Sequence, residues 1–189
     1  MVPLAVLERV ERDLGTDTDD AKGELDAAFA RFERTQPELA DRIGQALSRP
    51  LDETALALGY FLSIAIWLAF ERTFAARLGE VSADALQATE DALALEEELR
   101  AKNGDEPLDT DDVVAIEQPA ILAFVHEHVD AALDVTARAD DEDASESGER
   151  DVDVDDVHVV YRTTLVLILA LSHAVRPAAG MRGSAEMLA

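Results

Sequence analysis

Histidines and the acids beside them are the residues of this chain whose types and spacing suit chemistry. His126, Glu127 and His128 follow one another in a segment with helical periodicity. Because a helix turns by about 100° per residue, the two imidazoles project in different directions and do not form the paired ligands of a zinc-binding helix. The same spacing puts His128 within an apolar arc and His126 at its edge. We therefore expect His128 to be a core histidine with a hydrogen-bond partner rather than a ligand.

A polar stripe on the last apolar segment is the second candidate. Asp155, His158, Arg162 and His173 recur there among apolar residues. The stripe either binds an anion or handles protons, or it supplies an ion pair between helices, which is the interpretation we favour. Arg162 keeps its charge when buried, so burial requires a carboxylate or carbonyl partner.

A divalent metal centre is an alternative for the same residues. If His128 and His158 converged with Glu117 or Glu71, the donors would match the carboxylate and imidazole ligands of metal centres inside helical bundles. Those centres use a Glu-x-x-His motif, which this sequence lacks. The candidate ligand or metal residues are therefore His126, His128, Asp155, His158, Arg162 and Glu117, with no catalytic residue and no other cofactor expected.

An acidic series before the last apolar segment resembles part of a calcium loop. Asp151, Asp153 and Asp155 repeat the first three ligand positions of an EF-hand. Asp156 then stands where that loop needs glycine, and Arg162 stands where it needs a bidentate glutamate. We therefore expect these acids to form the approach to a helix.

Motifs of common enzyme classes are missing. The chain has no cysteine, and its glycines form neither a dinucleotide-binding fingerprint nor a phosphate-binding loop. No serine lies in a nucleophile elbow. These absences favour a protein that is not an enzyme.

Charge is the dominant feature of the composition. The chain has 41 acidic and 16 basic residues, a net charge of −25, and only two lysines, Lys22 and Lys102. Such a charge repels nucleic acid and anionic membranes, so we expect neither as a partner. A lysine-poor acidic surface is typical of adaptation to salt or selection for solubility.

Helical spacing bounded by proline, glycine and capping residues predicts the elements that position these side chains. The expected helices cover 3–14, 17–34, 37–48, 52–78, 82–102, 119–138 and 154–175, with a kink or restart at Gln118-Pro119 after the segment 109–118. Ala55, Gly59 and Ser63 form a small-residue stripe that would let another helix approach closely.

The expected fold is all-α, a single-domain bundle of about six or seven helices. The segments 54–78 and 157–175 are apolar on every side, so we place them at the centre. The bundle domain spans 1–176, with an acidic mobile loop at 138–152, and a flexible tail follows at 177–189.

A membrane span is a minor alternative for the uncharged run 54–70. This run is slightly shorter than the roughly 20 residues a spanning helix needs. Glu53 and Glu71 flank it, and Gly59 and Ser63 interrupt it. The N-terminal residues do not form a signal peptide. We expect a soluble, cytoplasmic protein.

Three hypotheses for function remain. The leading one is a non-enzymatic module that contacts another protein or a second copy of itself, through Leu4, Leu7 and Val10 or through the helix 86–99. The second is a bundle that binds a metal or small ligand between its central helices with the histidines and carboxylates. The third is an acidic mimic of nucleic acid, which requires carboxylates in rows on one face.

Overall fold

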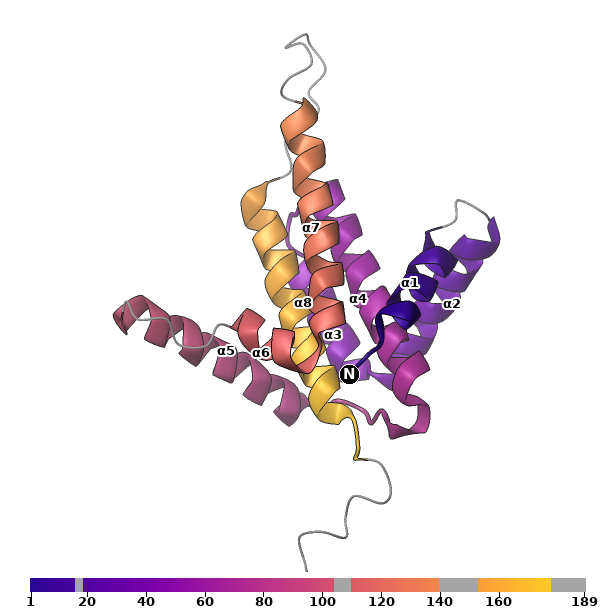
Figure 1. Cartoon of the computed structure of the whole chain (residues 1–189), viewed down its shortest axis with the longest axis horizontal. Coiled ribbons are helices and arrows are strands. Elements are labelled where there is room, and N and C mark those ends of the chain that lie inside the picture. The colour runs from indigo at the N-terminus through magenta and orange to yellow at the C-terminus, as the bar shows by residue number, and fades with distance from the viewer. Residues whose placement is uncertain (16–18, 104–109, 140–152, 178–189) are drawn as a thin grey trace, which may run out of the picture.

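A computed structural model of the chain describes residues 1–15, 19–103, 110–139 and 153–177. Within these residues the chain forms eight α-helices, one 3-10 turn and no β-strand (Figure 1). The all-α prediction is confirmed, and the helix beyond the expected seven is a short one formed by the segment before Gln118. The elements are α1 (Leu4–Leu14), α2 (Asp19–Thr35), α3 (Pro37–Leu47), α4 (Glu53–Phe74), η1 (Ala75–Arg77), α5 (Ala83–Asn103), α6 (Thr110–Glu117), α7 (Pro119–Ala139) and α8 (Val154–Ala174).

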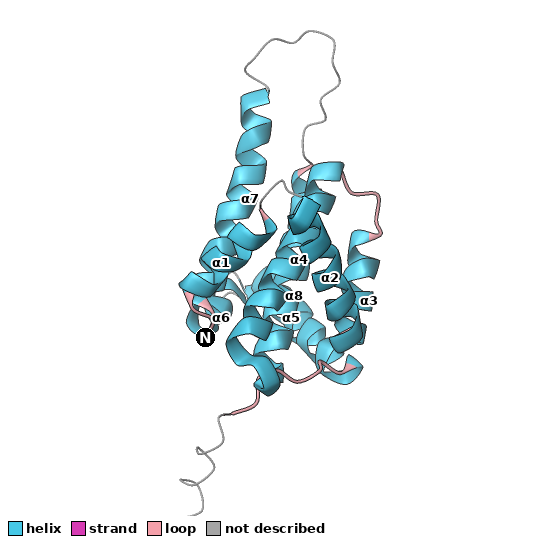
Figure 2. Cartoon of the chain, turned by 90° about the vertical axis from the view of Figure 1, so that its right-hand side faces the viewer, coloured by secondary structure: helices cyan, strands magenta, loops and turns pink. Residues whose placement is uncertain are grey.

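The two apolar helices α4 and α8 pack against each other at the centre of the bundle (Figures 1 and 2). In α4 every residue from Leu62 to Phe70 is buried, and in α8 every residue from Thr164 to Leu171 is buried. Burial on all sides requires other helices around them. Accordingly α1, α2 and α7 contact α4, while α5, α6 and α7 contact α8.

Hydrogen bonds join α4 and α8 at both ends, and these bonds show that the two helices are parallel. At the N-terminal ends of the two helices, the backbone N–H of Asp52 donates to the Asp156 carboxylate at 2.8 Å. At the other ends, the N–H of Gly79 donates to the carbonyl of Ala174 at 3.0 Å. Carboxylates in the first turns of both helices offset the positive helix ends that lie side by side there.

The α4 helix ends earlier than its sequence predicts. We expected it to continue to about Leu78, but it stops at Phe74 and the turn η1 follows. Ala75 has a φ of 46°, a conformation that side chains rarely adopt, and it is the only non-glycine residue with positive φ in the described residues. The reversal at Ala75 redirects the chain so that Leu78 pairs with Val175 beyond the end of α8.

A buried glutamine holds the loop between α4 and α5. Gln36 precedes Pro37, the first residue of α3, and is only 2% exposed. Its Nε2 donates to the carbonyl of Gly79 at 2.9 Å, and its Oε1 accepts from the N–H of Val81 at 2.8 Å. The amide therefore satisfies two backbone groups of a segment far away in the sequence.

A second buried glutamine repeats this arrangement at the junction of α6 and α7. Gln118 precedes Pro119, the first residue of α7, and is 5% exposed. Its Oε1 accepts from the N–H of Val2 at 2.9 Å, and its Nε2 donates to the Ser172 hydroxyl at 3.1 Å. The restart expected at Gln118-Pro119 is therefore also the point where the N-terminal segment is attached to the bundle.

The small-residue stripe of α4 lies where neighbouring helices approach most closely. Ala55, Gly59 and Ser63 are all buried. A Cβ atom on Gly59 would lie 2.8 Å from Leu47 of α3 and 3.3 Å from Val160 of α8. The close approach predicted from the spacing is thus present, and a side chain at position 59 would have to displace the end of the Leu47 side chain.

Two helical stretches are long and apolar enough, by length and composition alone, to cross a membrane. They are Glu53–Arg77 and Val154–Ala174, and the bundle buries 67% and 56% of their most apolar windows. The central helices of a soluble bundle have the same properties. Most of the predicted loop at 138–152 and the tail at 177–189 lie outside the described residues, so these two expectations stay predictions.

Candidate functional site

The first predicted site residue, His128, lies on α7 where this helix meets α1 and α4. Its Nδ1 is 2.8 Å from the carbonyl of Phe124, one turn earlier. Its Nε2 is 3.4 Å from a carboxylate oxygen of Glu11 on α1. The ring packs against Phe124 and Phe61, with centroids 4.2 and 5.1 Å away. The hydrogen-bond partner expected of His128 is present, but the residue is half-buried rather than part of the core.

The second imidazole of α7 has a different neighbour, as the angular spacing indicated. His126 is exposed, and its Nε2 is 2.9 Å from the hydroxyl of Tyr161 on α8. The two rings stack, with centroids 5.7 Å apart. His126 and His128 therefore contact α8 and α1 respectively, and each ring joins α7 to another helix.

The other predicted site residues are not assembled around these histidines. Asp155, His158 and Arg162 are exposed on α8, and Glu117 is half-buried at the end of α6. Glu71, which we considered as a further ligand, binds an arginine of α2 instead. In the part of the chain that the structure describes, no three His, Asp, Glu or Cys side chains are grouped so that they could hold a metal ion.

The acids that resemble a calcium loop cap helices. The Asp153 carboxylate accepts from the N–H of Asp155 at 2.9 Å and so caps α8. The Asp156 carboxylate accepts from the N–H of Asp52, as described above, and Asp52 in turn caps α4 through the N–H of Ala55 at 2.9 Å. Asp151 lies outside the described residues. These contacts agree with the expectation of an acidic approach to a helix.

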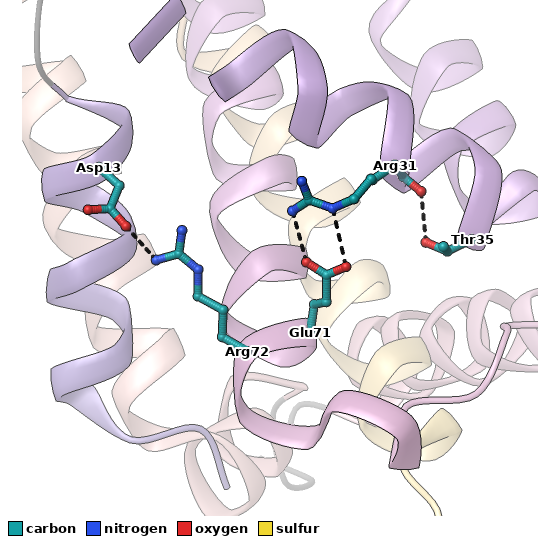
Figure 3. A network of polar contacts seen from close by, with 5 residues as sticks. All are labelled: Asp13, Arg31, Thr35, Glu71 and Arg72. Carbon is teal, nitrogen blue, oxygen red and sulfur yellow. Dashed lines mark hydrogen bonds and ion pairs between the residues drawn. The ribbon is translucent and has the colours of Figure 1, made fainter. Parts of the chain in front are cut away.

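A group of arginine and carboxylate side chains holds α1 and α2 against the end of α4 (Figure 3). Arg31 of α2 donates two hydrogen bonds to Glu71, and Arg72 of α4 donates to Asp13 of α1 at 2.7 Å. The Arg31 guanidinium also lies 5.6 Å from the ring centre of Trp67. All four charged groups are partly exposed to solvent. We assign them a structural role with a modest contribution to stability.

A further ion pair connects α3 to α5. Arg42 donates two hydrogen bonds to the carboxylate of Glu90. The hydrogen bonds that Arg42 donates to Glu90 raise the pKa of its guanidinium above the ordinary value.

An apolar groove between α2, α3 and α4 is the surface feature that the sequence did not indicate. It encloses about 530 Å³. Phe32, Ile43 and Ile64 form its floor and are at most 5% exposed, whereas Phe29 and Tyr60 at its edge are 36% and 40% exposed. Phe29 is thus only partly covered, whereas Phe32 on the same helix is buried. The full lining is Phe29, Phe32, Glu33, Pro37, Ala40, Asp41, Ile43, Gly44, Gln45, Ser48, Tyr60, Ser63 and Ile64.

The surfaces proposed for self-association on α1 and α5 are largely covered. Leu7 and Val10 are fully buried, because α1 uses that face to pack on α4, and only Leu4 of this set is exposed. On α5, Leu86 and Leu93 are buried against the bundle. The face of α1 that holds Leu7 and Val10 is therefore not available to a second chain, whereas Leu95 of α5 is 56% exposed and a contact through α5 stays a prediction.

Comparisons of the chain with family models, with curated proteins and with solved structures found no match.

Proposed function

We propose that this chain is a non-enzymatic module that acts by binding another protein chain. The observation that carries the proposal is the groove between α2, α3 and α4, where Phe29 and Tyr60 leave apolar surface uncovered beside a buried floor. A groove between helices with aromatic side chains at its edge suits the docking of a protein segment. Three of the polar residues considered as ligands, His126, His128 and Glu71, instead contact α8, α1 and α2 respectively.

We further propose that the module works in the cytoplasm and that its acidic surface is an adaptation to salt. A surface rich in carboxylates and poor in lysine keeps a protein soluble where its apolar groove would otherwise promote nonspecific association. Under this proposal most of the negative charge is independent of the binding function.

To test the proposal, the tagged chain would be purified gently and without chelators from the cells that make it, and its mass would be measured by native mass spectrometry. We expect a complex with a second chain at a fixed ratio. A bare monomer at all concentrations would overturn the proposal. A small additional mass that is lost on acid denaturation would indicate a bound metal ion or ligand, and it would support the alternative of a metal-binding or ligand-binding bundle. In that case the mass should be lost from a variant with alanine at both His128 and His158.

A further inference from the structure

We propose that the groove between α2, α3 and α4 binds an amphipathic helix with basic flanks that belongs to a different protein. This inference depends on the proposed function and specifies the partner. Three features support it: the aromatic edge of the groove, the small residues along its α3 side, and the charges at its rim.

The aromatic edge supplies the apolar contact. The rings of Phe29 on α2 and Tyr60 on α4 meet edge to face, with centroids 6.2 Å apart. Leu25 lies one turn before Phe29 on α2 and is 37% exposed, so it extends the apolar wall. Half-exposed aromatic side chains beside a buried floor are typical anchors for the apolar face of a helix.

Small residues on α3 leave room for a backbone to approach. Ala40, Gly44 and Ser48 stand at four-residue steps along the groove, and a Cβ atom on Gly44 would meet nothing within 4 Å. The equivalent glycine of α4, Gly59, receives a leucine and a valine from neighbouring helices. By analogy with the packing at Gly59, we expect the partner segment to be a helix that places a branched aliphatic side chain against Gly44.

The charges at the rim determine which helix fits. Glu33 and Asp41 are the charged residues that line the groove, and both are exposed carboxylates. Gln45 donates to the Asp41 carboxylate at 2.7 Å and holds it at the edge. A second copy of this chain would bring another net charge of −25, whereas a helix with lysine or arginine flanks would complement the rim.

Binding of two synthetic helical peptides tests the inference. The first carries leucine along one face and lysine on its flanks, and the second has glutamate in place of every lysine. Fluorescence anisotropy would be measured in the lowest salt at which circular dichroism shows the chain folded. We expect saturable binding of the lysine peptide and a dissociation constant at least about tenfold higher for the glutamate peptide.

Two glycine variants locate the binding site. Gly44→Leu fills the groove, and Gly23→Leu places the same side chain on α2, where a Cβ atom also meets nothing within 4 Å. Both changes remove a helical glycine, so neither should lower the stability of the fold. We expect Gly44→Leu to weaken binding of the lysine peptide at least about tenfold and Gly23→Leu to leave it unchanged.

Three results would overturn the inference: no saturable binding of the lysine peptide, equal binding of both peptides, or equal binding by both glycine variants. Purification of the native complex distinguishes a failure of this inference from a failure of the proposed function. If the tagged Gly44→Leu chain still carries its partner, the groove is not the docking site, although the chain remains an interaction module. If the unmodified chain carries no partner, the proposed function itself is wrong.

Discussion

Two helices of this chain carry the same small residues at the same spacing but have different surroundings. The stripe on α3 is Ala40, Gly44 and Ser48, the last being the residue that follows the helix end, and the stripe on α4 is Ala55, Gly59 and Ser63. On α4, side chains from α3 and α8 lie against the glycine, whereas on α3 the space over the glycine is open. A stripe of small residues therefore permits the close approach of another helix, but it does not ensure that such a helix is present.

The residues between the small ones decide which stripe is covered. On α4 they are almost all apolar, so burial of this side of the helix is favourable and brings α3 and α8 against Gly59. On α3 they include Asp41, Arg42 and Gln45, which are exposed. Burying that face within the chain would require partners for each polar group. A small-residue stripe on a polar helix is thus available to another molecule.

The largest effect should come from placing leucine at each glycine. Gly59→Leu forces a side chain against Leu47 and Val160, and we expect the free energy of unfolding to fall by about 3 kcal/mol or more. Gly44→Leu should raise it by about 0.5–1 kcal/mol, because leucine is the better helix former. Urea denaturation of both variants in the same salt measures the difference. Equal losses of stability would mean that the α3 stripe is covered after all.

Alanine at the same positions gives a smaller and more detailed comparison. Gly44→Ala should stabilise the chain by about 0.5–1 kcal/mol through helix propensity. Gly59→Ala gains the same helix propensity, but its new methyl group lies 2.8 Å from the end of the Leu47 side chain, and overpacking of about 2 kcal/mol there should leave a net loss of about 1 kcal/mol.

A Leu47→Ala background provides the control for the alanine comparison, since it removes the group that the new methyl would strike. In that background Gly59→Ala should become neutral or stabilising. A double-mutant cycle would then give a coupling energy of about 1 kcal/mol or more between positions 47 and 59. A coupling near zero would show that Leu47 does not limit the space at Gly59.

The serines of the two stripes should show the smallest difference. Ser63 is buried and donates to the carbonyl of Gly59 at 2.7 Å, whereas Ser48 is exposed and donates to the carbonyl of Gln45. We expect Ser63→Ala to lower the free energy of unfolding by about 0.5 kcal/mol, because the energy of the lost hydrogen bond is slightly larger than the gain in helix propensity. Ser48→Ala should have no measurable effect. A larger loss at Ser48 would indicate an undetected contact in the open stripe.

Much of the fold follows from local features of the sequence. Proline at 37 and 119 and the acidic caps before α4 and α8 predict where helices begin, because each effect acts within one turn. The end of α4 was predicted less well. Nothing near Ala75 indicates its positive φ, since the reversal there depends on pairing with the distant Val175.

The candidate site was predictable only in part, for the same reason. Angular spacing separated His126 from His128, and the structure confirms that they face different helices. Spacing cannot show that Glu11 and Tyr161 are their partners, because these residues belong to other helices. The roles of the two buried glutamines, and the groove itself, likewise depend on segments distant in sequence.

The parallel pair of α4 and α8 has a consequence for synthesis of the chain. The two residues that join the N-terminal ends of these helices, Asp52 and Asp156, are 104 positions apart in the sequence. At roughly 5–20 residues per second, a ribosome needs about 5–20 s to make the intervening chain. Until α8 has been made, α4 lacks the helix that covers one of its apolar sides. The rate of translation between the two helices therefore determines how long the incomplete core is exposed to aggregation and to chaperones.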